Sequence, residues 1–496
     1  MKKQKVTLIS FYFVNPGVRF LSAYLKRNGF DVSLIFLPPD KMYLKEGLYP
    51  KEMLERVYEI SKDSLFIGLS VFTNDYYRAL QLTGYLKGQD KGKPVIWGGI
   101  HPTISPENSL DAADYVYRGE GELGVLELAK VLAAGKEAEP LENIGYKRDG
   151  KIILNPVRPY IEPLDIIPPQ DFDADDHWYR SGDSILPVSE KITKEEFGTD
   201  FQTKGCTYLT VFSRGCPLGC AYCCNNKLNE IYKSEKKAFR IKGAGAMIED
   251  LEYAIKKMPF IRFIYINDDN FLFAKEEDIE RFASLYKEKI ALPFKVLGAP
   301  NAINEKGYSA FSLLKSAGLK EVHMGIQSGS ARVNRDIYKR YVSNKSVVEA
   351  AKLIKSMGFR ARYDFIYDNP YETESDLLGT AKLMLELPRP FIMQSFSLTF
   401  YPGTELYLKA RSDGIINKDT EDKLVYEHQS NIFSKERVTY LKFVCLMISR
   451  VPKWAGSMLI HPAVIFIFSR DKLNRVYAQV FSILKRIKDI LRLKPV

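Results

Sequence analysis

Short apolar runs alternate with amphipathic stretches through the first 135 residues of the chain. The apolar runs predict strands at Lys5–Phe11, Asp31–Leu37, Leu65–Val71, Pro94–Gly99 and Tyr115–Gly119. Helical periodicity lies between them, for example at Phe20–Asn28 and Tyr76–Lys87. Strands that are apolar on both faces and separated by helices predict a doubly wound, Rossmann-like α/β domain over residues 1–140. Such a sheet binds its ligands at the carboxyl ends of its strands.

Residues 141–205 lose this alternation and become rich in proline and acidic side chains. The segment contains Pro156, Pro159, Pro163, Pro168 and Pro169, followed by Asp171, Asp173, Asp175 and Asp176. Proline fixes φ and cannot donate a backbone hydrogen bond, so it disfavours helix interiors and central strands. We therefore expect a Pro-rich extended linker that lies over the surface.

The alternation resumes at residue 206 and continues to about residue 410. Strands are predicted at Tyr208–Ser213, Arg262–Asn267, Phe294–Ala299, Glu321–Gln327, Arg362–Tyr367 and Met393–Thr399. Helices are predicted at Ala246–Lys257, Glu277–Lys287, Ser346–Met357 and Glu374–Leu387. Six β/α units predict a partial (β/α)6 TIM barrel over residues 206–410, with an active site at the carboxyl ends of its strands. A mostly helical region is predicted over residues 411–496.

Length and charge narrow the class of protein. A chain of 496 residues exceeds one hydrophobic core, so two or three domains are expected. No stretch reaches about 18 uninterrupted apolar residues, and Met1-Lys-Lys-Gln runs straight into a predicted strand, so we expect a cytoplasmic location. The formal net charge is +11. No RNA-binding module follows the barrel pattern, so we expect no nucleic-acid partner.

The C-terminal end of the chain combines positive charge with helical periodicity. Residues 461–496 carry eight Lys or Arg against two Asp. One face of the pattern over 474–493 holds Val476, Val480, Ile483, Leu484, Ile487 and Leu491. A basic amphipathic helix of this kind can lie at a membrane interface. We therefore consider a membrane-surface contact through residues 470–496, with docking on the protein's own core as the equal alternative.

Five of the six cysteines fall within nineteen residues, from Cys206 to Cys224. In a chain without an export signal, such clustering favours a metal site over disulfides. Cys216, Cys220 and Cys223 have the spacing Cys-x3-Cys-x2-Cys directly after the first predicted barrel strand. Three thiolates on a four-iron cluster leave one iron open to a chelating substrate. A structural zinc site is the alternative, but zinc usually takes four Cys or His ligands, and no His lies in this loop.

The loop Cys216-Pro-Leu-Gly-Cys-Ala-Tyr-Cys223 resembles the signature of the radical S-adenosylmethionine superfamily, Cys-x3-Cys-x-aromatic-Cys. The resemblance implies that the three cysteines hold a [4Fe–4S] cluster whose open iron binds S-adenosylmethionine. One electron, from a donor such as ferredoxin or flavodoxin, then cleaves this cofactor to methionine and a 5′-deoxyadenosyl radical. Tyr222 matches the aromatic position, whose backbone meets the adenine in that superfamily. Cys206 and Cys224 are expected to be spare thiols.

Further segments match the superfamily in the order of its barrel. Asp268-Asp-Asn-Phe271 follows the second barrel strand, where many members carry Gly-Gly-Glu against the amino group of S-adenosylmethionine. Gly325-Ile-Gln-Ser-Gly-Ser330 resembles the Gly-x-Glu-Ser-Gly strand end of cobalamin-linked members. The resemblance assigns S-adenosylmethionine contacts to Tyr222, Asp268, Asp269, Asn270, Gln327 and Ser328. A polar turn is the alternative for residues 268–270, and structural turns are expected at the matching segments 368–373 and 401–406.

A doubly wound domain ahead of such a barrel resembles the cobalamin-binding domain of the B12-dependent radical enzymes. The matching segments are Gly68-Leu-Ser70, Trp97-Gly-Gly-Ile-His-Pro-Thr103 and Arg118-Gly-Glu-Gly-Glu122. The resemblance implies cobalamin contacts at Ser70, Gly98, Gly99, His101, Thr103, Gly119 and Glu120. The Asp-x-His-x-x-Gly motif is missing from the first β/α connection, so no lower histidine ligand to cobalt is expected. The alternative for His101 is a loop histidine that supports its turn, and the alternative for the domain is a degenerate fold that binds nothing.

Together these resemblances imply a cobalamin-dependent radical S-adenosylmethionine C-methyltransferase. We expect it to methylate an unactivated carbon of a small, hydrophobic or lipid-like substrate, without a dedicated acid–base pair. One alternative is a radical oxidoreductase or cyclase that uses the same cofactors without methyl transfer. A second alternative is a non-enzymatic iron–sulfur or cobalamin sensor.

Overall fold

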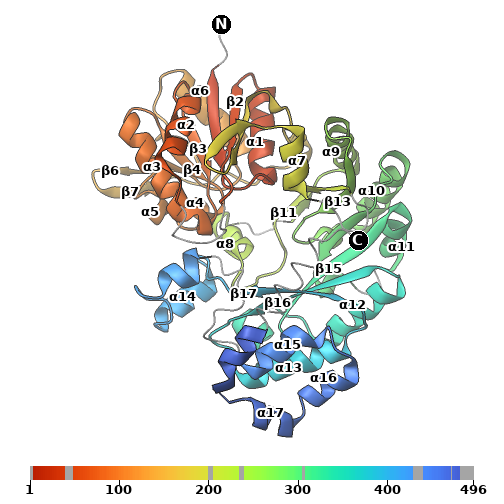
Figure 1. Ribbon diagram of the computed structural model, residues 1–496. Helices are drawn as coiled ribbons and strands as arrows, with labels where there is room; N and C mark the ends of the chain where they lie inside the picture. The colour runs from red at the N-terminus through yellow and green to blue at the C-terminus, as the bar shows by residue number, and fades with distance from the viewer. Residues whose placement is uncertain are drawn as a thin grey trace. The chain divides into compact units, whose positions relative to one another are not determined.

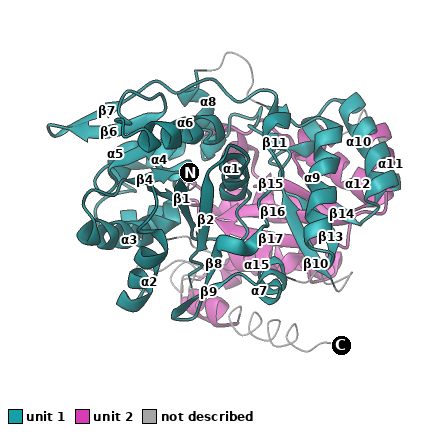
Figure 2. Cartoon of the chain, turned by 90° about the horizontal axis from the view of Figure 1, so that it is seen from above, with its two compact units in different colours: residues 1–294, 316–318, 400–428 teal, residues 295–315, 319–399, 429–496 magenta. Residues whose placement is uncertain are grey.

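The computed structural model describes residues 4–39, 48–198, 205–233, 239–303, 308–427, 439–470 and 472–480 (Figure 1). The chain divides into two compact units, coloured separately in Figure 2. Unit 1 comprises residues 1–294, 316–318 and 400–428. Unit 2 comprises residues 295–315, 319–399 and 429–496.

The N-terminal part of unit 1 is a nine-stranded sheet in the order β7-β6-β5-β4-β3-β1-β2-β8-β9. Its parallel centre consists of β1 (Lys5–Ser10), β2 (Asp31–Phe36), β3 (Ile67–Ser70), β4 (Val95–Gly98) and β5 (Tyr115–Tyr117). These five strands overlap the five apolar runs of the sequence, and the doubly wound fold class is confirmed. A buried cluster that includes Ile9, Ile35, Leu69 and Trp97 packs against one face.

Helices connect these parallel strands, as the sequence periodicity indicates. They are α1 (Pro16–Arg27), α2 (Lys51–Ser61), α3 (Tyr76–Gln89), α4 (Ile100–Ile104), α5 (Pro106–Ser109) and α6 (Glu122–Ala133). Helix α1 begins one turn before the predicted start at Phe20. Asn15 caps it by accepting a hydrogen bond from the Val18 amide at 3.3 Å, and Pro16 occupies the first turn, where no amide donor is needed.

The segment expected to be an extended linker contains regular structure that continues the sheet. Strands β6 (Ile144–Arg148) and β7 (Lys151–Leu154) form a hairpin that pairs antiparallel with β5. Strand β8 (His177–Ser181) pairs with β2 and continues into β9 (Ser184–Pro187), and α7 (Glu190–Phe197) follows. These strands are four or five residues long between turns and prolines, too short for a period of two to be recognised. The expectation of a purely extended linker therefore does not hold, whereas the domain boundaries themselves stay predictions.

The second α/β region forms a six-stranded sheet in the order β10-β13-β14-β15-β16-β17. Its strands are β10 (Cys206–Thr210), β13 (Ile261–Ile266), β14 (Phe294–Gly298), β15 (Leu319–Gln327), β16 (Arg360–Tyr367) and β17 (Ile392–Ser397). The pairs β10–β13, β15–β16 and β16–β17 are parallel. The helices are α9 (Ala244–Lys257), α10 (Glu276–Lys289), α11 (Tyr308–Ala317), α12 (Asn344–Ser356) and α13 (Glu374–Glu386). Strand number and order confirm the predicted half-barrel.

The C-terminal region is helical, as predicted. It contains α14 (Glu405–Ser412), the single turn η8 (Asp422–Tyr426), α15 (Tyr440–Ile448), α16 (Lys453–Leu459) and α17 (Pro462–Phe468). Of the predicted amphipathic helix over 474–493, residues 474–480 are helical and residues 481–493 lie outside the described part of the chain. Within the described part, no helix is long and apolar enough to cross a membrane.

Candidate cofactor site

The cysteine loop lies between a short strand and a helix of unit 1. Strand β11 (Ser213–Arg214) pairs antiparallel with β12 (Arg240–Ile241), and α8 (Cys224–Ile231) begins directly after Cys223. Gly215 has φ +80°, a conformation that glycine adopts without the steric cost of a side chain. The Cys223 amide donates to the Cys220 carbonyl at 3.1 Å. The loop is therefore a tight turn that presents its thiols just ahead of a helix.

Burial controls the chemistry of these thiols. Cys216 and Cys220 are buried, and Cys223 is partly buried. Burial raises the pKa of Cys216 to about 11 and raises the pKa of Cys223 well above its usual value. Thiolates there need a cation to stabilise them, as the ligands of an iron–sulfur cluster do. Among the described residues, no three His, Cys, Asp or Glu side chains gather closely enough to hold a single metal ion. The cluster ligands therefore stay a prediction from the loop sequence.

The acidic turn after β13 supports the cysteine loop. The Asn270 side-chain amide donates to Cys216 Sγ at 3.0 Å. Asp268 Oδ1 accepts hydrogen bonds from the Phe212 and Ser213 amides at 2.7 and 2.9 Å, and burial raises the Asp268 pKa to about 7. These contacts show a positioning role for Asp268 and Asn270 in this structure, and their S-adenosylmethionine contacts stay predictions.

Two other segments hold the loop in place. Asn225 donates from its side-chain amide to Asp269 Oδ2 at 2.7 Å, which ties the first turn of α8 to the acidic turn. The Leu406 amide donates to the Ala221 carbonyl at 2.9 Å, so the segment 401–406 braces the middle of the cysteine loop. Tyr222 lies between the second and third cysteines and is partly buried.

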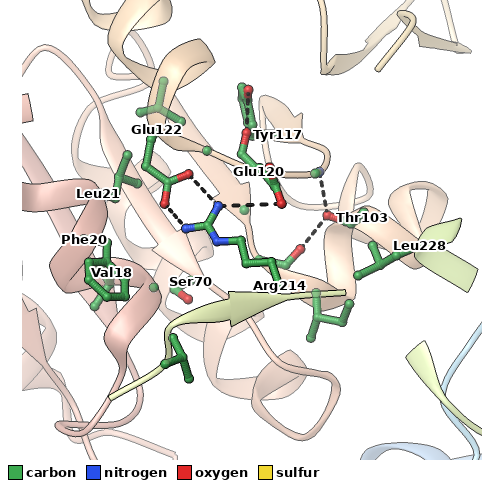
Figure 3. A pocket seen from close by; sticks show the side chains of 18 of the residues that line it. Val18, Phe20, Leu21, Ser70, Thr103, Tyr117, Glu120, Glu122, Arg214 and Leu228 are labelled. Atoms are coloured by element: carbon green, nitrogen blue, oxygen red, sulfur yellow. Dashed lines mark hydrogen bonds and ion pairs between the residues drawn. The ribbon is translucent and has the colours of Figure 1, made fainter. Parts of the chain in front are cut away.

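A cavity of about 500 Å³ in unit 1 joins the N-terminal sheet to the cysteine loop (Figure 3). Its lining includes Ser70, Gly98, Gly99, Thr103, Gly119 and Glu120, six of the seven residues predicted to contact cobalamin. Ser213, Arg214, Gly215, Asp268 and Asp269 line it from the cysteine-loop side. The structure therefore brings the predicted cobalamin residues and the start of the cysteine loop to one cavity.

Glycine makes room at two of these strand ends. Gly99 has φ +97°, and a methyl group on it would stand 3.2 Å from the Val71 amide nitrogen and carbonyl oxygen. Gly119 has φ +91°, and a methyl group there would overlap the Tyr232 hydroxyl. The Thr103 hydroxyl donates to the Gly99 carbonyl at 2.7 Å and accepts from the Gly119 amide at 3.0 Å. The absence of side chains therefore lets Val71 and Tyr232 pack closely against these strand ends. Gly98, Gly99 and Gly119 also line the cavity, and a glycine-lined space at strand ends fits a bulky, flat ligand such as cobalamin.

Arg214 makes an ion-pair network at the cavity wall that sequence reasoning missed. Its guanidinium contacts both carboxylate oxygens of Glu122, one at 3.1 Å, and it lies 3.7 Å from Glu120 (Figure 3). Arg240 also binds Glu120 through two nitrogens, at 2.6 and 3.1 Å. Burial alone would raise the pKa of Glu122, but the Arg214 charge outweighs burial and lowers it. Two features of the sequence could have indicated this network. Arg214 lies two residues before Cys216, and the segment 118–122 ends with the acidic residues Glu120 and Glu122.

Two tyrosines extend this wall. Tyr160 and Tyr232 stack with ring centroids 3.8 Å apart, and the Arg240 guanidinium lies 4.2 Å from the Tyr160 centroid. The Tyr232 hydroxyl accepts a hydrogen bond from the Glu120 amide at 2.7 Å. Stacked aromatic rings and paired charges therefore form one side of the cavity.

His101 lies outside the set of residues that line the cavity. Its ring is fully buried, Nδ1 is 3.2 Å from the Thr73 hydroxyl, and the Tyr76 ring packs edge-on at 5.4 Å. Burial lowers the His101 pKa to about 4, so the ring is neutral at neutral pH. These contacts are with residues of the preceding connection and agree with the structural alternative, and the cobalamin contact of His101 stays a prediction.

Gln327 and Ser328 belong to unit 2, where Gln327 is the last residue of β15 and Ser328 follows it. Gln327 has φ +72° at the end of the strand. Ser328 is buried, its hydroxyl lies 3.3 Å from the Thr380 hydroxyl, and its oxygen accepts from the Ser330 amide at 3.1 Å. Within unit 2, Ser328 is therefore part of a buried hydrogen-bond network that links β15 to α13.

Comparisons with known proteins agree with this arrangement. A sequence model of the radical SAM superfamily matches residues 210–384, and a model of the B12 binding domain matches residues 6–129. An uncharacterized methyltransferase of Pyrococcus horikoshii is 28% identical over 363 residues, which is 71% of each chain. The anaerobic magnesium-protoporphyrin IX monomethyl ester cyclase of Rubrivivax gelatinosus is 23% identical over 74% of this chain and 61% of its own length.

One solved structure illustrates the shared fold. The radical S-adenosylmethionine methyltransferase TsrM from Kitasatospora setae, with cobalamin and a [4Fe–4S] cluster bound, matches with a TM-score of 0.61. The match covers 83% of this chain and 78% of that chain at 15% identity.

Proposed function

Because the chain belongs to the radical S-adenosylmethionine superfamily and carries a B12-binding domain, we propose that this cobalamin-dependent, methyltransferase-type enzyme methylates an unactivated carbon of a hydrophobic small molecule. The observation that carries the proposal is the cavity of unit 1. Glycine strand ends of the B12-binding domain and the first residues of the cysteine loop line the same space.

The chain's own residues hold and shield the two reactive groups. When bound, the cluster with S-adenosylmethionine supplies a carbon-centred radical and cobalamin supplies the methyl group. Cys216, Cys220 and Cys223 would hold the cluster, and the accessible backbone at Gly99 and Gly119 would admit the cobalamin ring. Arg214, paired with Glu122, and the stacked Tyr160 and Tyr232 keep that wall rigid and dry. Exclusion of water protects reactive intermediates from side reactions.

The hydrophobic nature of the substrate is part of the proposal. It is supported by the apolar and basic C-terminal region, which the sequence associates with a membrane surface over residues 470–496. Co-sedimentation with anionic vesicles before and after deletion of residues 470–496 tests that contact. Equal binding by both proteins would remove this support. A small iron–sulfur or flavin protein, such as a ferredoxin or flavodoxin, is the proposed electron donor.

A second candidate function is a radical cyclase or oxidoreductase reaction without methyl transfer. One specific observation favours it: the relative from Rubrivivax gelatinosus is named as a cyclase and aligns with 74% of this chain. The two functions share cofactors and differ in the fate of the methyl group of S-adenosylmethionine.

One experiment separates these functions. The full chain is purified and reconstituted without oxygen, then reduced in the presence of methyl-labelled S-adenosylmethionine, cobalamin and a total lipid extract. Label in the lipid fraction together with 5′-deoxyadenosine supports C-methylation. Oxidised or cyclised lipid with 5′-deoxyadenosine and no label supports the second candidate. A loaded protein that forms no 5′-deoxyadenosine contradicts both and favours a sensor.

A further inference from the structure

Helix α17 of unit 2 is apolar at all seven of its positions, yet none of them is buried. Phe466 is 81% exposed, and Ile467 and Phe468 are also exposed. In the neighbouring helix α16, Trp454 is 69% and Met458 is 60% exposed. Large side chains gathered in this way usually mark an interaction site, because a protein surface rarely exposes contiguous apolar area. These five side chains are called the α16–α17 apolar face below.

The α16–α17 apolar face belongs to well-anchored helices. The Tyr440 ring of α15 stacks on Phe468 at 5.7 Å, and its hydroxyl donates to the Leu459 carbonyl at 2.9 Å. The Tyr477 hydroxyl donates to the Phe468 carbonyl at 2.9 Å. On the inner side of α16, Gly456 is buried so closely that an added methyl group would stand 2.7 Å from Leu385. The helices are therefore held to unit 2 on one side and present apolar side chains on the other.

Exposed basic residues flank the apolar residues of α16 and α17 along the chain. Arg450, Lys453, Arg470, Lys472 and Arg475 are all exposed. Residues 450–480 of the sequence contain these five basic residues and a single acidic one, Asp471. A second copy of the chain seated on the same face would bring two such basic rims together, and like charges oppose that contact. An anionic surface satisfies both the charge and the exposed apolar area.

We propose that the α16–α17 apolar face docks on the surface of an anionic lipid membrane. Phe466, Ile467 and Trp454 enter the boundary between head groups and acyl chains, where aromatic side chains are favoured. The five basic side chains bind the anionic head groups, and each strengthens binding about fivefold. The apolar part of this contact is assigned to α16 and α17, whereas Arg470, Lys472 and Arg475 of the basic part belong to the segment 470–496. The inference does not depend on methyl transfer.

The chain carries its own reporter for this contact. Trp454 is the exposed tryptophan, whereas Trp97 is fully buried and Trp178 is partly buried. The full chain is mixed with vesicles of phosphatidylcholine and phosphatidylglycerol in equal parts, and separately with phosphatidylcholine alone. We expect a blue shift of tryptophan emission with the anionic vesicles that high salt weakens. Trp454→Phe should abolish most of the shift while the protein still co-sediments.

Substitutions test the two parts of the surface separately. Phe466→Asp should weaken co-sedimentation more than about tenfold, because it places a charge where the ring enters the lipid. Lys453→Glu with Lys472→Glu should weaken it by at least about fivefold for each basic side chain lost. Leu408→Asp is the matched control, since Leu408 is 55% exposed on α14 in unit 1, and it should bind as the unchanged protein does.

Each contrary outcome overturns the proposal. The proposal fails if the unchanged protein ignores anionic vesicles, or if Phe466→Asp and Leu408→Asp bind equally well. It also fails if the protein forms dimers that Phe466→Asp dissociates while vesicle binding is absent. The melting temperature of each variant is measured first. If Phe466→Asp proves unfolded, the Lys453 and Lys472 pair decides the matter alone.

Discussion

Strand ends differ between the two units. Those of the B12-binding domain in unit 1 border a cavity, whereas those of β15 and β16 in unit 2 do the opposite and lie in a hydrogen-bond network. In unit 1, Gly99 and Gly119 at strand ends leave backbone beside an open cavity. After β15, the Gly329 amide donates to the Thr380 hydroxyl at 2.9 Å, and the Ser330 hydroxyl donates to Asp376 at 2.5 Å. The glycines at the strand ends of unit 1 thus border open space, whereas the small residues after β15 are closed off by hydrogen bonds to α13.

The two regions also differ in the ionisation of their buried carboxyl groups. Glu122 in unit 1 is fully paired with Arg214, and its pKa is lowered. In unit 2, burial and the neighbouring carboxylates of Asp376 and Asp368 raise the pKa of Glu372 to about 8. The cavity wall thus gains from keeping its carboxylate ionised, whereas the closed network of unit 2 favours a protonated one.

The largest expected effect is on the cysteine loop, the part of unit 1 with no counterpart in the unit 2 network. Serine at any one of Cys216, Cys220 and Cys223 should abolish 5′-deoxyadenosine formation and lower bound iron, because serine is a poor ligand for a cluster. Iron and sulfide analysis with the deoxyadenosine assay measures this. Cys206→Ser is the control and should keep both signals. Full activity in a Cys220→Ser protein would contradict the assignment.

The second effect sharpens the contrast in charge. Arg214→Gln leaves Glu122 buried without its partner, which should lower the free energy of unfolding by about 3–5 kcal/mol. Urea unfolding monitored by circular dichroism measures the loss. The double variant Arg214→Gln with Glu122→Gln removes the unpaired charge and should recover most of it. A single variant as stable as the unchanged protein would show that the pair contributes nothing.

The third effect concerns the space beside Gly99 in the cavity and is measured as cobalamin binding. Gly99→Ala adds a methyl group at φ +97° beside the cavity and should weaken cobalamin binding at least tenfold, about 1.4 kcal/mol. Gly29→Ala is matched in strain, since Gly29 has φ +91°, but no atom lies within 4 Å of the added methyl group. Gly99→Ala should lose more stability than Gly29→Ala, because its methyl group also stands 3.2 Å from the Val71 backbone, and it alone should lose cobalamin in equilibrium dialysis. Equal dialysis results for the two would place the ligand elsewhere.

The smallest effect belongs to unit 2. Its folded state keeps a proton on Glu372 up to about pH 8, whereas the unfolded chain releases it near its ordinary value of 4.5. Stability from this group is therefore full below about pH 4.5 and is lost as the pH rises through 8. Glu372→Gln should flatten that decline, with a gain of about 1 kcal/mol at pH 9 and less at pH 6. Unfolding curves at both pH values test this, and the exposed neighbour variant Glu374→Gln should follow the unchanged protein.

The sequence was sufficient for the parallel strands and for six of the seven predicted cobalamin residues, which line the cavity. Apolar runs such as Asp31–Leu37 are long enough to define buried strands, and Ser70, Gly98 and Thr103 follow such runs at positions that must share one edge of the sheet. The contact of Arg214 with Glu122 could not be predicted, because 92 residues separate the two in the chain. Asn270 was assigned to a cofactor from its motif, but its contact with Cys216 depends on the turn geometry after β13.

His101 shows a further limit of motif reasoning. The segment 97–103 places it between Gly99 and Thr103, both of which line the cavity. Its ring instead packs among Tyr76 and Thr73, because successive residues of α4 point in different directions. The short strands β6 to β9 were missed for a related reason, since a few residues carry too little pattern to define a face.

The two hairpins at the borders of the nine-stranded sheet determine where the N-terminal domain can be cut. The B12 binding model ends at residue 129, but β6 and β7 cover β5, and β8 and β9 cover β2. A fragment ending near residue 140 would expose the edges of β2 and β5. Their backbone donors and acceptors could then pair with other chains. An isolated domain that stays monomeric in solution should therefore extend at least through Pro187.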